Sequence, residues 1–198
     1  GIYNRSYFLT ELARVVDRAR RAQQISILLY IDLDNFKYVN DTLGHLAGDR
    51  LLIEVCQLLH KRARRSDLIA RLGGDEFCML LYDTHAEEAQ AIAESFRKAL
   101  ADYRFRQASE QVDMGCSIGA TIINAESRSA EEVLSRADFA CHLAKCAGRN
   151  RVHMFDMKDE ANVTALSLDM GWSRRIKDAI AHNKFVLAGQ PIVDTRSR

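Results

Sequence analysis

Acidic side chains stand at two points of the sequence where their chemistry can be combined. The segment Asp32-Leu-Asp34 directly follows a nearly apolar run, and Gly73-Gly74-Asp75-Glu76 lies between two further apolar segments. Carboxylates that converge on one place cannot all stay ionised without a cation. Their hard oxygen atoms select Mg²⁺ or Mn²⁺, and these ions bind nucleotide phosphates. The pattern therefore indicates a divalent metal site that handles a phosphate compound.

Each motif alone also has an ordinary structural explanation. An Asp after a strand is often a helix cap or a loop residue, and Gly-Gly-Asp is typical of a turn. The two motifs together, in this order and at this separation, are far more specific than either one.

The surrounding elements are predicted to bring these acids together. Residues 25–31 form a continuous, nearly apolar run that is typical of a buried strand, so Asp32 would lie at its end. Residues 68–82 are apolar on both sides of residues 73–76, which predicts a hairpin with that tetrapeptide at its turn. If the strand lies beside the hairpin, the carboxylates meet within a few ångströms. The two glycines would let the backbone approach a ligand closely.

The remaining pattern predicts an α/β (α+β) fold in which helices flank a mixed central sheet of about five strands. Apolar residues at helical spacing and apolar strand-like runs predict the other elements. Helices are expected at 6–22, 46–64, 86–101 and 130–147, and strands at 111–123 and 151–155. The last of these helices would begin at a capping box, Ser129-x-x-Glu132, and end at Gly148.

The composition of the 198-residue chain is that of an ordinary globular protein. Hydrophobic residues make up 47% and charged residues 28%, and a formal net charge of +1 gives no support to a protein that coats nucleic acid. No apolar run approaches the roughly 20 residues that span a bilayer. Five scattered cysteines without a C-x-x-C pair suit a reducing cytosol, so we expect a cytoplasmic protein without a zinc site.

Several motif blocks, taken in order, resemble one known family. The blocks are Asp32-Leu-Asp-Asn-Phe-Lys37, Asn40-Asp41, Gly44-His45, Gly48-Asp49, Gly73-Gly-Asp-Glu-Phe77, Ser117-Ile-Gly119, Ala137-Asp138, Ala144-Lys145 and Gly148-Arg-Asn150. Over about residues 1–155 the chain resembles the GGDEF family of diguanylate cyclases. The family's N-terminal signature, normally Asp-x-Leu-Thr-Gly-Leu-x-Asn-Arg, is present only in part, as Gly1-Ile-Tyr-Asn-Arg5.

The resemblance implies an enzyme and its reaction. A diguanylate cyclase is a nucleotidyltransferase that condenses two GTP molecules into cyclic di-GMP and releases pyrophosphate. The resemblance further implies two Mg²⁺ or Mn²⁺ ions per active site and a fold similar to the palm domain of nucleotidyl cyclases. One GTP would bind to each of two facing domains, so a homodimer is required for catalysis.

The resemblance also implies roles for individual residues. Asp32, Asp75 and the Leu33 carbonyl would hold metal, whereas Glu76 would be either the general base or a ligand of the second metal. Gly73 and Gly74 would leave room for the α- and β-phosphates. The remaining residues implied to bind GTP are Phe36, Lys37, Asn40, His45, Asp49, Lys145 and Arg149.

Physical chemistry supports some of these assignments. The Asp49 carboxylate can accept hydrogen bonds from guanine N1 and N2, which adenine cannot offer. Lys145 and Arg149 are four residues apart, so we expect them on one helical face, where both cations reach one anion.

A second site is implied just before the glycine turn. Arg64 and Asp67 match the family's inhibitory R-x-x-D site, at which the product cyclic di-GMP binds. An Arg can donate to phosphate and guanine while an Asp accepts from the guanine edge. The alternative is a surface ion pair within the basic stretch 61–65.

The last forty residues differ from the rest. Trp172, Arg175-Ile176 and Phe185-Val-Leu-x-x-Gln190-Pro-Ile-Val193 resemble the linker and first strand of an EAL phosphodiesterase domain. We therefore expect a GGDEF domain at 1–156, a connecting helix at 157–183 and a truncated EAL strand at 184–198. The EAL catalytic residues would lie beyond Arg198, so we expect no phosphodiesterase activity here. The alternative function is a catalytically silent GTP-binding domain that regulates a C-terminal EAL phosphodiesterase.

Overall fold

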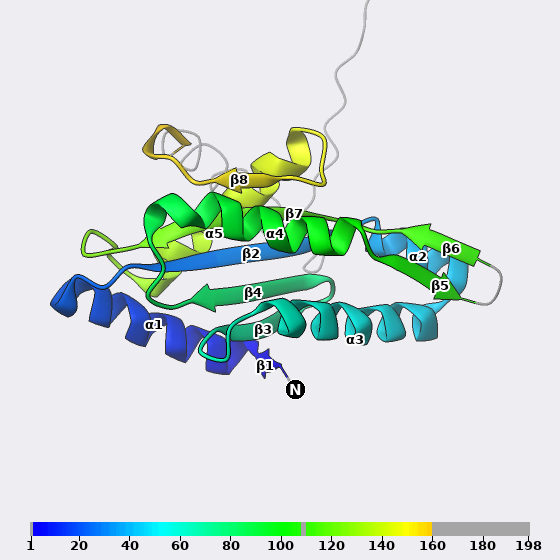
Figure 1. Ribbon diagram of the computed structural model, residues 1–198, viewed down its shortest axis with the longest axis horizontal. Coiled ribbons are helices and arrows are strands. Elements are labelled where there is room, and N and C mark those ends of the chain that lie inside the picture. The colour runs from blue at the N-terminus through cyan, green and yellow to red at the C-terminus, as the bar shows by residue number, and fades with distance from the viewer. Residues whose placement is uncertain (1, 108–109, 160–198) are drawn as a thin grey trace, which may run out of the picture. The chain divides into compact units, whose positions relative to one another are not determined.

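A six-stranded mixed sheet forms the centre of the first part of the chain (Figure 1). The computed structural model describes residues 2–107 and 110–159. The strand order is β1 (Tyr3–Asn4), β3 (Leu68–Gly73), β4 (Glu76–Leu81), β2 (Ser26–Asp34), β7 (Gly115–Ile123) and β8 (Val152–Met154). β2 is antiparallel to both of its neighbours, whereas β1–β3 and β7–β8 are parallel pairs.

Helices cover both faces of this sheet (Figure 1). One face packs against α1 (Arg5–Ala22) and α5 (Ala130–Cys146). The other face packs against α2 (Phe36–Leu43), α3 (His45–Arg62) and α4 (Ala89–Ala101). A short 3₁₀ turn, η1 (Ala86–Glu88), precedes α4, and β5 (Arg104–Gln107) pairs with β6 (Glu110–Asp113) in a separate hairpin. The predicted mixed sheet flanked by helices is confirmed.

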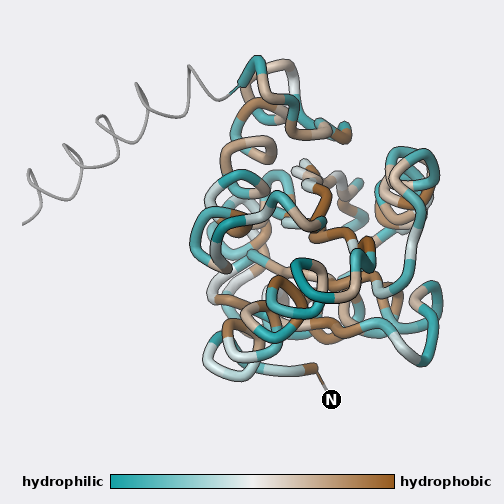
Figure 2. The backbone as a smooth tube through the Cα atoms, turned by 90° about the vertical axis from the view of Figure 1, so that its left-hand side faces the viewer, coloured by the Kyte–Doolittle hydropathy of each residue, from teal (hydrophilic) through white to brown (hydrophobic). Residues whose placement is uncertain are grey.

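The central strand β2 divides the core into two layers. Its residues Ile27, Leu29, Ile31 and Leu33 belong to the core under α2, α3 and α4, whereas Leu28 and Tyr30 belong to the core under α1 and α5. Side chains alternate along a strand, so Asp32 and Asp34 emerge on the α1–α5 face. Figure 2 shows the apolar backbone segments gathered between the helices.

Two predicted strand boundaries are wrong for physical reasons. β2 continues through Asp34, because ladder partners on both sides extend to the acidic residues. The single strand expected at 111–123 is divided into β6 and β7, because residues 110–113 pair with β5 instead of the main sheet. The sheet also has six strands instead of about five, since the two-residue edge strand β1 is too short to show a period.

The helix α2 was not predicted. It lies within the motif-rich segment after β2 and is separated from α3 by Gly44, which has a φ of 84°. That left-handed conformation suits glycine and breaks one helical pattern into two. Phe36 and Val39, three residues apart and both buried, are the apolar signal from which this helix could have been predicted.

The ends of α5 follow the predicted capping chemistry. The Ser129 hydroxyl accepts a hydrogen bond from the Glu132 backbone N–H at 3.2 Å. The Glu132 carboxylate accepts from the Arg128 N–H at 2.8 Å, one residue before the position expected for a capping box. After the helix, Gly148 has a φ of 114°, which a side chain would oppose.

The chain divides into two compact units, Gly1–Asp156 and Met157–Arg198. In the second unit the structure describes one short 3₁₀ turn, Met157–Asp159. The connecting helix and the EAL-like strand expected at 157–183 and 184–198 therefore lie almost wholly outside the described residues. Among the helices that are described, none combines the length and apolar character needed to cross a membrane.

The packing of α5 against β7 depends on Gly119. A Cβ at this position would lie 1.9 Å from the Ala137 carbonyl oxygen and 2.2 Å from the Cys141 nitrogen. We expect Gly119→Ala to lower the free energy of unfolding by about 3 kcal/mol, because backbone cannot move away without lifting the helix. Urea denaturation measures the change. The control is Gly73→Ala, whose Cβ meets nothing within 4 Å and should cost roughly 0.5 kcal/mol or less. Equal midpoints for the two variants would contradict this packing.

Candidate active site

The end of β2 and the glycine turn are joined by the sheet itself. Asp32 lies directly opposite Glu76 in the β2–β4 ladder. One residue further, the Leu33 N–H donates to the Asp75 carbonyl oxygen at 3.3 Å. The two predicted motifs thus lie side by side in the sheet, although Asp32 and Gly73 are 41 residues apart in the sequence.

Asp32 is buried, and the pKa of its carboxyl is raised. Burial raises the pKa of its carboxyl from the ordinary 3.8 to about 6, and the charges of Asp75 and Glu76 add to the rise. Lys145 opposes this, because its Nζ lies 2.5 Å from Asp32 Oδ2. Burial alone would lower the pKa of Lys145, but the bond to Asp32 outweighs burial and the pKa is raised. Asp32 is therefore a carboxylate that needs a cation beside it.

Asp34 has a structural role that its position in the motif did not indicate. Its buried carboxylate accepts from the Ser117 hydroxyl at 2.8 Å and from the Asn150 N–H at 2.9 Å. The Asn150 side chain in turn accepts from Arg97 at 2.9 Å. Both of Asp34's oxygens are thus used by the protein, and they fix the turn after α5 to the central strand.

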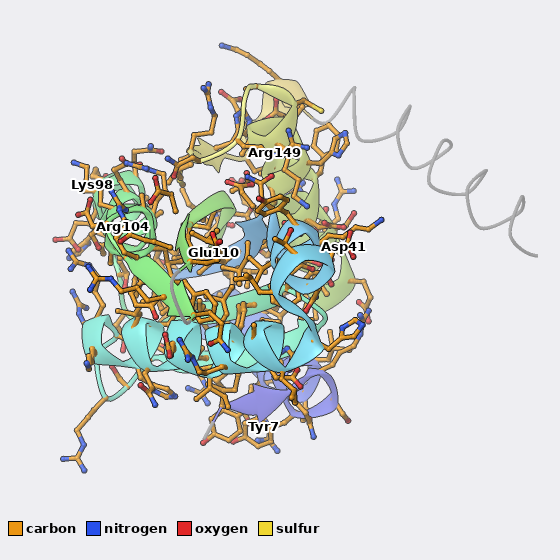
Figure 3. The ribbon with its side chains drawn as sticks, turned by 90° about the vertical axis from the view of Figure 1, so that its right-hand side faces the viewer. Tyr7, Asp41, Lys98, Arg104, Glu110 and Arg149 are labelled. Atoms are coloured by element: carbon orange, nitrogen blue, oxygen red, sulfur yellow. The ribbon has the colours of Figure 1, made fainter. Side chains whose placement is uncertain are left out.

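Arg149 lies in that turn, which corrects the expectation that it shares a helical face with Lys145. α5 ends at Cys146, and Arg149 has a left-handed φ of 61°. Figure 3 shows Arg149 at the end of α5, on the side of the molecule that also carries α2 with Asp41. Arg149 is exposed, so its guanidinium is available to an anion in solution.

Glu76 faces a cavity of about 480 Å³ between α1 and α5. Tyr30 and Asp138 line this cavity with it. Burial and then the charges of Asp138 and Glu76 raise the pKa of Tyr30, and burial together with Glu76 raises the pKa of Asp138. Sequence reasoning did not select Tyr30 or Asp138 as site residues. Tyr30 points from β2 toward α5, and Asp138 lies on α5. This proximity is apparent only once it is known which helices cover which face of the sheet.

An open pocket of about 800 Å³ lies on the other side of the glycine turn. Asp49 of α3 lines it together with Gly73 and Gly74, while Leu52 and Ile53 supply apolar surface. A flat aromatic base with a polar edge suits such a lining, because apolar walls take the ring and the carboxylate takes its hydrogen-bond donors. The pocket adjoins the acidic residues through the turn that both share.

The other predicted substrate residues are placed as follows. The Asn40 side chain packs against Gly48, where a Cβ would lie 2.0 Å from Asn40 Oδ1. Lys37 and His45 are exposed on α2 and at the start of α3. Phe36 is buried in the hydrophobic core, where its side chain supports α2. The binding roles of these residues stay predictions.

Arg71 is a residue that sequence reasoning missed. Its Nε–H donates to the Gly74 carbonyl oxygen at 2.8 Å, across a register shift between Arg71 and Gly73. Gly74 has a φ of 50°, so the turn needs both glycine and support. Arg71 also lines the pocket of about 800 Å³ that contains Asp49. An Arg two residues before a Gly-Gly turn is the signal that could have identified it.

The predicted second site lies at the opposite end of β3. The Arg64 N–H donates to Asp67 Oδ2 at 2.8 Å, and the Asp67 N–H donates to the Arg64 carbonyl oxygen at 3.0 Å. Burial raises the pKa of Asp67, whereas the Arg64 side chain is exposed. Residues 68–72 of the strand separate Asp67 from Gly73, a distance of about 20 Å along β3.

The donors at the end of β2 are suited to a hard cation. All of them are oxygens, and the Lys145 ammonium already occupies a cation position on Asp32. Within residues 2–107 and 110–159, no group of three or more His, Cys, Asp or Glu side chains is arranged to hold a metal. Mg²⁺ in nucleotide sites commonly takes one or two carboxylates and completes its shell with phosphates and water. The arrangement therefore fits a metal that arrives with a phosphate ligand.

The fold and the site together define a class. A mixed sheet flanked by helices, with an acidic strand end, a glycine turn and an adjoining pocket, has the arrangement of an α/β domain of the palm type. The family model described as "Diguanylate cyclase, GGDEF domain" matches residues 1–151 of the chain. The chain belongs to the GGDEF family.

Individual relatives agree with this assignment. The chain is 41% identical over 178 residues to the probable diguanylate cyclase DgcE of Escherichia coli K12, covering 88% of this chain and 16% of that protein. It is 34% identical over 195 residues to the cyclic di-GMP phosphodiesterase PdeB of Shewanella oneidensis, covering 97% of this chain and 22% of that protein. The chain thus spans less than a quarter of either relative.

A solved structure shows the same fold. The GGDEF domain of DgcB from Caulobacter crescentus, in complex with c-di-GMP, is 30% identical and superposes with a TM-score of 0.73. The match covers 77% of this chain and 91% of that domain. The expected palm-like fold and the family resemblance are confirmed.

The bond from Arg71 to the turn can be tested without a substrate. Arg71→Lys keeps the charge but removes the planar Nε–H, so the turn should loosen. We expect exchange of the Leu33 amide, which donates to Asp75, to become about ten-fold faster in NMR hydrogen-exchange measurements. The matched control is Arg104→Lys, which loses a bond to the Ala101 carbonyl oxygen far from this turn. If both variants left Leu33 unchanged, the turn would be held by other contacts.

Proposed function

We propose that this chain is a diguanylate cyclase domain that condenses two GTP molecules into cyclic di-GMP and pyrophosphate. The observation that carries the proposal is the meeting of Asp32 with the Asp75–Glu76 turn beside the pocket that Asp49 lines. Membership of the GGDEF family supports the same reaction.

Asp32, Asp75 and the Leu33 carbonyl would hold Mg²⁺ or Mn²⁺. When bound, two such cations neutralise phosphate charge and make the 3′-hydroxyl of GTP easier to deprotonate. Glu76 would either accept the proton of that hydroxyl or complete the second metal site. Its neighbour Tyr30 has a raised pKa, so this phenol stays protonated and neutral, and Asp138 lines the same cavity.

The nucleotide would lie with its base in the pocket and its phosphates over the glycine turn. Asp49 would accept from guanine N1 and N2, and Asn40, braced by Gly48, would contact the same base. Cationic side chains would pair with the triphosphate, with Gly73 and Gly74 leaving room for the backbone to approach it. Those cations are Lys37, Lys145 and Arg149.

Each chain would contribute half of the active site. In a homodimer with facing sites, the 3′-oxygen of one GTP attacks the α-phosphorus of the other. The new bond joins that oxygen to phosphorus, the bond from the α-phosphorus to the bridging oxygen breaks, and pyrophosphate leaves. Two such steps close the cyclic dinucleotide.

Product inhibition at Arg64 and Asp67 forms part of the proposal. The backbone of this turn holds the Asp67 carboxylate in place while the Arg64 side chain extends into solvent. A guanine edge could be bound by the carboxylate and a phosphate by the guanidinium.

The alternative is a catalytically silent GTP-binding domain that regulates an EAL phosphodiesterase. The similarity to the phosphodiesterase PdeB, which covers 97% of this chain, favours this alternative. The presence of Asp32, Gly73, Gly74, Asp75 and Glu76 together favours catalysis, because a binding module needs fewer of them.

One assay separates these functions. We expect the protein at high concentration, with GTP and Mg²⁺, to form cyclic di-GMP and pyrophosphate, with specific activity rising with protein concentration. Asp75→Asn should reduce the rate at least about 100-fold. Loss of a charged metal ligand raises the activation free energy by several kcal/mol, because the metal no longer stabilises the charge of the transition state as well. The control, Asp113→Asn, changes an exposed carboxylate on β6 and should leave the rate unchanged. GTP binding without turnover would instead establish the silent module.

The product site has its own test. Arg64→Ala should weaken cyclic di-GMP binding at least about ten-fold in calorimetry, because one charged bidentate partner is lost. Arg65→Ala removes the neighbouring exposed charge and serves as the matched control. Equal affinities for the two variants and the unmodified chain would remove Arg64 from the site.

A further inference from the structure

The ion pair between Lys145 and Asp32 has a consequence for how the active site fills. Lys145 Nζ lies 2.5 Å from Asp32 Oδ2, and the two side chains are 34% and 10% exposed. This oxygen belongs to one of the two buried acids at the end of β2. A divalent cation that binds the same oxygen competes with the ammonium for its lone pairs and is repelled by its charge at close range.

The displacement has a cost when the metal arrives alone. A divalent cation next to an undisplaced ammonium is repelled, and a displaced ammonium loses its partner in a partly desolvated place. Lys145 stands near the end of α5, next to the turn that carries the exposed Arg149. An incoming triphosphate would give the released ammonium a new anion there, so the nucleotide offsets the cost that the metal meets.

We propose that Lys145 acts as the resident cation of the metal-free site and exchanges Asp32 for the nucleotide phosphates when metal and GTP bind together. The inference rests on the proposed function, since it uses Asp32 as a metal ligand. It adds that Lys145 opposes binding of metal alone and couples metal entry to triphosphate entry. The divalent cations then enter the site only together with the substrate.

The coupling differs from simple charge repulsion in one measurable way. Any cation near the site disfavours metal, but among the described residues Lys145 is the cation that occupies the ligand oxygen itself. Arg149 has the same charge, lies nearby in sequence and makes no ion pair with Asp32 among the described residues. Comparing variants at these two positions separates occupation of the oxygen from the general field.

The test measures Mn²⁺ binding by electron paramagnetic resonance without nucleotide. We expect Lys145→Met to bind Mn²⁺ about ten-fold more tightly than the unmodified chain, because the competing bond is gone. Arg149→Met should change the affinity by about three-fold or less, since it removes only a screened charge. Lys98→Met, on the exposed end of α4, controls for loss of a distant lysine and should have no effect.

A second measurement uses the unmodified chain. The side-chain ammonium signal of Lys145 should be visible by ¹⁵N NMR in the metal-free protein and should lose its Asp32-paired position when Mg²⁺ and a non-hydrolysable GTP analogue are added together. Mg²⁺ alone at the same concentration should change it far less.

The outcomes separate the two proposals. Equal Mn²⁺ affinities for Lys145→Met and the unmodified chain, or equal gains for the Lys145 and Arg149 variants, would overturn the exchange while leaving the metal site intact. Absence of Mn²⁺ binding to every variant, Lys145→Met included, would remove the metal site and with it the proposed function.

Discussion

Negative charge concentrated at the buried end of a central strand is the constraint on which the rest of the site depends. Asp32 belongs to β2, which has ladder partners on both sides, so its carboxylate cannot turn away into solvent. Glu76 lies opposite it and Asp75 adjoins it, and these charges add to burial in opposing its ionisation. Such an arrangement is stable only with a positive charge beside it. The folded chain supplies that charge from α5, and the proposed reaction would supply it from divalent cations.

The positive side of the site is held by contacts that take no part in chemistry. α5 can approach β7 because Gly119 has no side chain, and the Cys141 thiol donates to the Ser117 carbonyl oxygen at 3.2 Å. The turn that carries Arg149 is fixed by Asp34 through the Asn150 N–H. Asp34 therefore serves the same site as Asp32 without facing the same ligand. Asp32 pairs with a cation, whereas Asp34, two positions later, holds the turn after α5 in place.

Local chemistry explains which parts of this fold and site could be predicted. The buried strand before Asp32, the hairpin around Gly74 and the cap at Ser129 each depend on a few neighbouring residues, and sequence reasoning identified all three. The partners of Asp34 lie 83 and 116 residues away, so no local pattern indicates them. Arg149 was misplaced because a helical period was extended past Gly148. The turn conformation, not the spacing, decides where that side chain lies.

The separation of the two proposed ligand sites limits how one could affect the other. The glycine turn and the Arg64–Asp67 turn stand at opposite ends of β3, and each is closed by its own local hydrogen bonds. β3 pairs with β4 along its length, with a register shift between Arg71 and Gly73, and with the two-residue strand β1 at Ala70 and Arg71. A packed strand of this kind offers no second arrangement for a ligand to select. A product bound at Arg64 would therefore inhibit by restraining how two half-sites meet, rather than by distorting the metal ligands within one chain.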